Sequence, residues 1–255
     1  MKWLAPLLLA SSSCFGALVE KTVDYDHDGT TLEGFHVYDD ATAGKRPGIL
    51  IIHQWTGLTD YEKGRARQLA EMGYNVLAAD IYGKGIRPQP PEAGEYAGKY
   101  KNDRELYRGR LKAGLEVLRA DEHTDPSKIA AIGYCFGGTG VLELARSGAD
   151  IAGVVSFHGG LDAGEGMRAK AGTLKAKILV CTGADDPHVP PAQVMAFEEE
   201  MRQAEADWLL VSYGHAVHAF TQKNAGDDPS KGVAYNEAAD RRSWQHMKDF
   251  FAEIF

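Results

Sequence analysis

The stretch Lys128-Ile-Ala-Ala-Ile-Gly-Tyr-Cys-Phe-Gly-Gly-Thr-Gly140 constrains the fold more than any other part of the chain. An apolar, strand-like run ends there in a G-x-C-x-G turn, and apolar residues with helical spacing follow over 141–145. Gly133 and Gly137 allow a tight bend and a close approach of strand and helix. The pattern therefore predicts a strand, a sharp turn and a helix, with Cys135 presented at the turn.

A cysteine in this place is either a nucleophile or a small buried hydrophobic residue. The free N–H groups and the dipole of the following helix favour negative charge at its amino end, where a thiol ionises more easily. A free thiol has a pKa of about 8.5 and needs a neighbouring base to react at neutral pH. The flanking glycines and the strand-to-helix context favour the nucleophile over core packing for Cys135.

Composition and the amino terminus limit the class of protein. The chain has 255 residues, of which 44% are hydrophobic and 25% charged, enough for one large globular domain. Its net charge of −8 argues against nucleic acid and anionic membrane surfaces as partners. Residues 1–16 have one positive charge, a short apolar stretch and then small residues. We expect 1–16 to be a signal peptide, 17–255 a single domain without an integral membrane segment, and the protein to be exported to the periplasm.

Two alternatives to a cleaved leader are a lipid anchor on Cys14 and an uncleaved apolar helix. The anchor is disfavoured because Ser11 stands where a bacterial lipobox has an apolar residue. After cleavage only Cys135 and Cys181 would remain, both at or in expected core strands, so no disulfide framework is expected. We interpret Cys181 as core packing.

The rest of the chain alternates expected strands and helices. Apolar and polar residues alternate on both sides of a turn at 27–30, which predicts an antiparallel edge hairpin over 19–25 and 32–38. Further strands are expected over 47–53, 75–80, 151–157, 176–183 and 208–213. Helices are expected over 61–72, 103–120, 191–204 and 234–255. This order predicts a doubly wound α/β domain with a mostly parallel sheet.

Residues 82–103 follow one of these strands and are rich in proline, glycine and tyrosine. We expect a long loop that walls or covers a pocket, because loops at the carboxyl ends of parallel strands carry function. The alternative is a surface excursion without a role.

Two other loops at the carboxyl ends of strands contain an acid or a histidine. Asp185 and Asp186 follow the strand that ends at Gly183, and His215 and His218 follow the next strand. The order nucleophile, acid, histidine is the order of the α/β-hydrolase triad. On spacing alone, either acid and either histidine fits.

The chain resembles the dienelactone hydrolase family of α/β-hydrolases over essentially all of the expected mature part. The resemblance rests on G-Y-C-F-G-G at the elbow, on Asp186-Pro-His-Val-Pro190, and on His218-Ala-Phe220. It implies an α/β-hydrolase fold, with Cys135 as the nucleophile, Asp186 as the acid and His218 as the base.

The remaining acid and histidines are assigned other roles. Asp185 and His215 are out of phase with the family motifs, so we expect a turn or capping residue and a solvated or pocket-lining residue, respectively. A metal site formed by His158, His188, His215 and His218 is a weaker alternative, because their spacing matches no usual ligand pattern. We therefore expect no metal and no organic cofactor.

Acyl transfer also needs two N–H donors for the carbonyl oxyanion. In this fold they belong to the residue after the nucleophile and to a residue in the loop after the third strand. Here these are Phe136 and Trp55.

Two features differ from the best-studied members of the family. A glutamate that contacts the resting thiol in those enzymes corresponds to Gln54, which cannot accept a proton, so we expect a simple Cys–His pair. Two arginines that bind a substrate carboxylate are missing, and Lys84 and Gln222 stand near the corresponding loops. The expected pocket residues are Gln54, Tyr82, Lys84, His158 and Gln222.

The sequence thus predicts a hydrolase of a small-molecule carboxylic ester or lactone that works through a thiol acyl-enzyme. The alternative is a non-catalytic small-molecule-binding protein on the same fold, suggested by Gln54 and the missing arginines.

Overall fold

The computed structural model describes residues 16–255. The expected signal peptide and the alternative anchor at Cys14 lie outside the described residues, apart from Gly16. Among the helices of the described part, none has the length and apolar character needed to cross a bilayer.

Over residues 16–255, eight strands form one sheet in the order β1-β2-β4-β3-β5-β6-β7-β8. β1 pairs with β2 and β2 with β4 in antiparallel fashion, and all other neighbours are parallel. The strands are β1 (Leu18–His27), β2 (Thr30–Asp39), β3 (Arg46–Ile52), β4 (Asn75–Ala79), β5 (Thr124–Tyr134), β6 (Gly153–Phe157), β7 (Lys177–Gly183) and β8 (Trp208–Tyr213).

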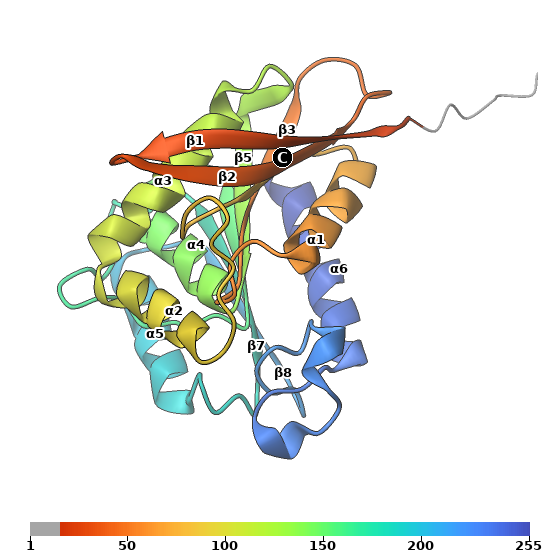
Figure 1. Ribbon diagram of the computed structural model, residues 1–255. Helices are drawn as coiled ribbons and strands as arrows, with labels where there is room; N and C mark the ends of the chain where they lie inside the picture. Colours follow the sequence, from red (N-terminus) through yellow and green to blue (C-terminus); the bar gives the residue numbers. More distant parts are fainter. Residues whose placement is uncertain (1–15) are drawn as a thin grey trace, which may run out of the picture.

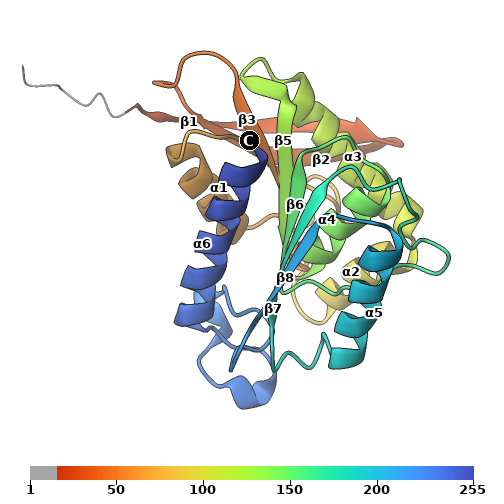
Figure 2. The same ribbon diagram turned by 180° about the vertical axis from the view of Figure 1, so that it is seen from behind.

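Helices cover both faces of the sheet (Figures 1 and 2). One face is covered by α1 and α6, and the other by α2, α3, α4 and α5. The helices are α1 (Asp60–Glu71), α2 (Glu92–Asn102), α3 (Arg104–Ala120), α4 (Phe136–Arg146), α5 (Pro191–Gln203) and α6 (Glu237–Ile254). Two short 3-10 turns, η1 (Lys223–Ala225) and η2 (Pro229–Lys231), lie between β8 and α6.

Each face of the sheet has its own apolar core. Leu50 and Ile52 of β3 pack into the core beneath α3 and α4, whereas Ile49 and Ile51 pack into the core beneath α1 and α6. Successive side chains of a strand point to opposite faces, so a strand buried on both sides must be apolar throughout. Each such side chain contributes about 1.5–3 kcal/mol by leaving water. This burial explains the continuous apolar run in the sequence.

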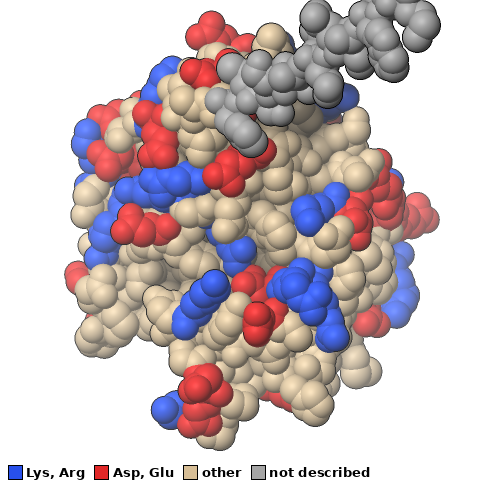
Figure 3. All heavy atoms as spheres, turned by 90° about the vertical axis from the view of Figure 1, so that its right-hand side faces the viewer, with Lys and Arg blue, Asp and Glu red and all other residues tan. Residues whose placement is uncertain are grey.

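The predicted fold class, a mostly parallel sheet with an antiparallel edge hairpin, is confirmed. The final helix begins at Glu237 instead of 234, because the Asn236 side chain caps it by accepting from the N–H of Ala239 at 3.0 Å. Charges on the outer surface are mixed: on the side that Figure 3 shows, Lys and Arg lie among Asp and Glu, so neither sign forms a continuous patch there.

The expected loop over 82–103 is wrong in part, because its second half is helix α2. Ala93, Ala97 and Tyr100 are buried at spacings of four and three residues, which is the pattern of an amphipathic helix. Pro88, Pro90 and Pro91 all precede that helix, so they do not interrupt it.

The turn between β5 and α4 is so tight that the chain needs glycine on both sides of Cys135. Cys135 has φ 53° and ψ −112°, a conformation that side-chain-bearing residues rarely adopt. A Cβ on Gly133 would lie 2.0 Å from the carbonyl oxygen of Gly137, and a Cβ on Gly137 would lie 2.1 Å from that of Ile52. Only glycine therefore lets α4 start so close to β3 and β5.

Replacing Gly137 with alanine should unfold or strongly destabilise the protein, because its Cβ would overlap a backbone oxygen that cannot move independently of the sheet. We expect the free energy of unfolding to fall by about 3 kcal/mol. The matched control is Gly64→Ala in α1, where a Cβ meets nothing within 4 Å. In this variant the free energy of unfolding should rise by about 0.5–1 kcal/mol. Urea denaturation measures both, and equal stability of the two variants would contradict this account of the turn.

Candidate active site

The structure brings three of the predicted site residues into direct contact. The Sγ of Cys135, after β5, lies 3.1 Å from Nε2 of His218, in the loop after β8. Nδ1 of His218 lies 2.9 Å from Oδ2 of Asp186, in the loop after β7. Because parallel strands end at the same edge of the sheet, residues 83 and 32 positions apart in the chain form one hydrogen-bonded row.

The backbones of the acid and the histidine are held by local hydrogen bonds. Asp186 is buried, and its Oδ1 accepts from the backbone N–H of His188 at 2.8 Å. The N–H of His218 donates to the carbonyl of Gly232, and the carbonyl of His218 accepts from Ala234. These contacts fix the carboxylate of Asp186 and the backbone of His218.

The electrostatics of the row favour a charged pair. Burial raises the pKa of the Cys135 thiol, but the hydrogen bond and charge of His218 outweigh it, so the pKa lies below its ordinary value. Burial lowers the pKa of His218, but hydrogen bonds to Asp186 and Cys135 raise it to about 10. Both shifts favour a thiolate beside an imidazolium, which is the reactive form of a thiol nucleophile.

The two residues expected to supply the oxyanion donors both line the cavity that contains Cys135. Phe136 is the first residue of α4, where the backbone N–H has no partner within the helix. Trp55 lies in the β3–α1 loop, and both residues line the same cavity as Cys135. The Tyr82 hydroxyl donates to the carbonyl of Trp55 at 3.0 Å, which fixes the peptide of this loop.

The buried carboxylate of Glu62 also holds the β3–α1 loop in place. Glu62 accepts from the N–H of Gln54 at 3.2 Å and from the N–H and hydroxyl of Thr59 at 2.9 and 2.7 Å. Burial raises its pKa, and these hydrogen bonds oppose that rise. This capping box therefore both starts α1 and shapes the loop that contains Trp55.

A cavity of about 560 Å³ opens above Cys135. Its walls come from the β3–α1 loop, α2, the elbow, the loop after β6 and the loops that contain Asp186 and His218. Gly94, Ala97 and Gly98 give α2 a wall of small side chains. A ligand of moderate size can therefore lie between α2 and Trp55 with one atom against the thiol.

The expected pocket residues fall into three groups. Gln54 and Gln222 line the cavity. Tyr82 and His158 are buried behind it, against Trp55 and His218, respectively. Lys84 lies elsewhere: it is exposed and does not line the cavity, because its ammonium group pairs with Asp24 at 2.5 Å and Glu33 at 3.6 Å in the edge hairpin. The expectation for Lys84 is therefore corrected.

Sequence reasoning missed Lys101, Asp162 and His188, which all line the cavity. Lys101 was missed because α2 was expected to be a loop, although the spacing of Ala93, Ala97 and Tyr100 could have indicated it. Asp162 and His188 lie on irregular loops, where no periodicity identifies a residue.

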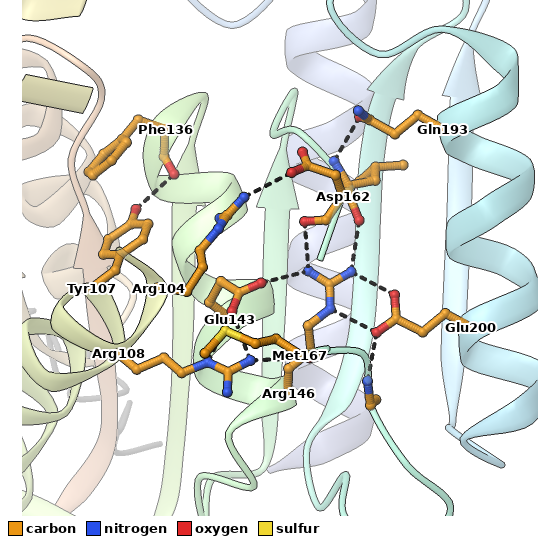
Figure 4. Close-up of polar contacts among 12 residues, drawn as sticks. Arg104, Tyr107, Arg108, Phe136, Glu143, Arg146, Asp162, Met167, Gln193 and Glu200 are labelled. Atoms are coloured by element: carbon orange, nitrogen blue, oxygen red, sulfur yellow. Dashed lines mark hydrogen bonds and ion pairs between the residues drawn. The ribbon is translucent and has the colours of Figure 1, made fainter. Parts of the chain in front are cut away.

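Asp162 is held by a network of hydrogen bonds and ion pairs around Arg104 and Arg146 (Figure 4). Arg104 donates to its carboxylate at 2.8 Å, and Arg146 donates to its carbonyl at 3.2 Å. Arg146 also pairs with Glu143 at 3.1 Å and with Glu200 at 2.8 Å. The network joins α3, α4 and α5 to the loop after β6, so that this wall of the cavity is fixed.

The second acid and second histidine lie outside the row. Asp185 and His215 are exposed, and neither lines the cavity. The carbonyl of His215 accepts from the Asn236 side chain at 3.3 Å. Within residues 16–255, His, Cys, Asp and Glu side chains form no group of three or more arranged to hold a metal ion.

The mostly parallel sheet, its flanking helices and the elbow after β5 define an α/β-hydrolase fold. Residues 32–255 match the family described as the dienelactone hydrolase family. A solved dienelactone hydrolase-like promiscuous phosphotriesterase from metagenomic libraries is 40% identical, with 94% of this chain and 100% of that chain covered and a TM-score of 0.89. A structure titled m3DLH is 37% identical at the same coverage, with a TM-score of 0.88.

A curated relative from Yersinia pestis, named as a candidate carboxymethylenebutenolidase, is 24% identical over 242 residues, which are 88% of this chain and 85% of that protein. The chain belongs to the dienelactone hydrolase family. It is a hydrolase of the ester and lactone type that this family represents.

If His218 sustains the thiolate, the ultraviolet absorbance of the thiolate should already be present at neutral pH, relative to Cys135→Ala. It should disappear on acidification through the lowered pKa of Cys135. In His218→Ala burial still acts on the thiol but the hydrogen bond and charge of His218 are gone, so the signal should appear at higher pH than in the wild type. A titration of both proteins measures the two midpoints, and equal midpoints would contradict the assigned pairing.

Proposed function

We propose that the protein hydrolyses a carboxylic ester or lactone through Cys135, His218 and Asp186, with a thiol acyl-enzyme as intermediate. The Cys135 thiolate attacks the carbonyl carbon, and the carbonyl electron pair moves to oxygen. When the oxyanion collapses, the C–O bond to the alcohol breaks and His218 gives its proton to the leaving oxygen. Water then attacks the thioester, His218 takes its proton, and the acid and the free thiolate are formed.

The contact of 3.1 Å between the Cys135 sulfur and His218 carries this proposal. This contact supports activation of the thiol by His218 in the resting protein, without a carboxylic acid at position 54. Gln54 lines the cavity, but its side chain makes no hydrogen bond to the sulfur among the described contacts. The departure at Gln54 therefore agrees with direct activation by His218.

The proposal also assigns stabilisation of the oxyanion to the N–H groups of Phe136 and Trp55. The position of Phe136 at the start of α4 adds the positive end of the helix dipole. Loss of one such donor costs about 3 kcal/mol in other acyl-transfer enzymes. The capping box of Glu62 and Thr59 supports this assignment because it holds the loop of Trp55 without occupying its N–H.

The acyl-enzyme can be detected directly. Mass spectrometry of the intact protein during turnover of short aryl esters should show one added acyl group on the wild type. Cys135→Ala should show no adduct and no turnover above background, because it has no nucleophile. Cys135→Ser, with a hydroxyl of much higher pKa, should turn over far more slowly. An unchanged rate in Cys135→Ala would refute thiol catalysis.

Asp186→Asn should lower kcat/KM by a hundredfold or more, roughly the size of a general-base contribution, because an amide cannot stabilise the imidazolium. The neighbouring Asp185→Asn is the matched control: it removes the same charge at an exposed site outside the row and should leave kcat/KM within about twofold. Steady-state kinetics on one aryl ester compares them. Equal losses in the two variants would mean that Asp186 has no special role.

A neutral phosphotriester is a second substrate class for the same residues. The observation that favours it is the name of a relative that is 40% identical over 94% of this chain. The thiolate would attack phosphorus and expel an aryloxide, and the phosphoryl oxygen would occupy the site of the carbonyl oxyanion. The mass experiment tests this class as well, since a phosphoryl adduct differs in mass from an acyl adduct.

A non-catalytic binder on this fold remains the alternative. It predicts no adduct and no turnover for any ester, lactone or phosphotriester, together with saturable binding in the cavity. The charged pair of Cys135 and His218 weighs against it, because a binding site has no need of an activated thiol.

A further inference from the structure

A second histidine lies against the row but outside the cavity lining. His158 follows β6, is fully buried, and has a φ of +40°. Its ring centre lies 5.3 Å from that of His218 in an edge-to-face arrangement, and 5.1 Å from that of Phe220. A non-glycine residue in this conformation costs about 1–3 kcal/mol, so the surrounding structure must hold it there.

His158 has one polar partner. Its Nε2 lies 2.8 Å from the hydroxyl of Thr221, whereas Nδ1 has no hydrogen-bond partner among the described residues. A proton on Nδ1 would be a buried, unpaired donor, so we place the proton on Nε2, where it donates to Thr221. Burial and the charge of His218 hold the pKa of His158 well below its ordinary value, which keeps this ring neutral.

Thr221 is fixed from the other side by α1. The Tyr61 hydroxyl lies 2.7 Å from the Thr221 hydroxyl, and Arg65 donates to the Thr221 carbonyl at 3.3 Å. Arg65 is itself anchored by Asp240 of α6 at 2.6 Å. Both polar atoms of Thr221 are therefore held by groups on regular elements.

This anchor lies three residues after His218, in a segment with little regular structure of its own. His215 and Ala219 have positive φ, and η1 begins only at Lys223. Asp186 and Cys135 each hold one nitrogen of the His218 ring, but hydrogen bonds to the two ring nitrogens do not by themselves prevent the plane of the ring from tilting. Packing against His158 removes that freedom.

We propose that His158 and Thr221 are positioning residues for His218. The ring of His158 holds the His218 imidazole in line with the Cys135 sulfur, and the hydrogen bond to Thr221 ties His158 to the loop of His218. Because His158 stays neutral, it neither repels the imidazolium nor competes for its proton. The inference rests on the proposed function, since it assigns these residues to the activation of the thiol.

The titratable and charged groups around His218 can each shift the pH at which the thiolate forms. They are Cys135 from the elbow, Asp186 and His188 from the loop after β7, and His158 from the loop after β6; the ring of His188 lies 4.9 Å from that of His218. Lys101 of α2 also acts on the thiol, because its charge lowers the pKa of Cys135. The test variants leave all these side chains in place except His158 in one case. A shift of the thiolate titration midpoint in the Thr221 variants therefore reports a change in how His218 is aligned with the Cys135 sulfur.

The decisive variant is Thr221→Val, which keeps the shape of the side chain and removes the hydroxyl. We expect kcat on an aryl ester to fall roughly tenfold with KM within about twofold, because misalignment affects the chemical step. The midpoint of the thiolate titration should move to higher pH. Thr221→Ser restores the hydroxyl and should recover both values. His158→Phe keeps a ring but loses the hydrogen bond and should resemble Thr221→Val.

A buried threonine elsewhere supplies the control. Thr182 in β7 is buried and its hydroxyl has no partner among the described residues, so Thr182→Val should leave kcat and the titration unchanged. A wild-type titration midpoint in folded Thr221→Val would overturn the proposal, as would equal defects in Thr221→Val and Thr221→Ser. The titration needs no substrate, so it decides the matter even if the wild type hydrolyses no ester, a result that would refute only the proposed function.

Discussion

The rest of the site depends on one close backbone contact, the approach of α4 to β3 and β5 through Gly133 and Gly137. With no Cβ at either place, the helix begins directly at the end of the sheet. Cys135 is thereby forced into a conformation that residues with side chains seldom adopt. Its sulfur and the first N–H groups of α4 then face the same point of the cavity. The proposed nucleophile and one proposed oxyanion donor thus share one structural cause.

The two neighbouring histidines of this site, His218 and His158, differ in how strongly they favour a positive charge. Hydrogen bonds to Asp186 and Cys135 favour the imidazolium of His218, whereas burial keeps the adjacent His158 neutral. Two imidazoles in ring contact are therefore shifted toward different protonation states, because only one has a carboxylate beside it. This difference agrees with the separate roles proposed for the pair, one in proton transfer and one in alignment.

The walls of the cavity are supported by buried charges that do not themselves touch the sulfur. Glu62 holds the β3–α1 loop, and Arg146 with its two carboxylate partners holds the loop after β6. Removal of one member would leave a buried charge unpaired, a cost of about 3–5 kcal/mol. These contacts tie both loops to the helices α1, α4 and α5, which pack on the sheet.

The sequence by itself determined the order of strands and helices along the chain and the elbow at Cys135, because these follow from periodicity and glycine spacing. The resemblance to the family then singled out Asp186 and His218 on two neighbouring loops. The tertiary structure decided what depends on contacts between distant segments. It placed Lys101 in the wall of the cavity, on a helix that follows a proline-rich stretch, and it paired Lys84 with Asp24 of β1. Periodicity reports which face of an element is buried, whereas irregular loops take their course from packing that only the folded chain contains.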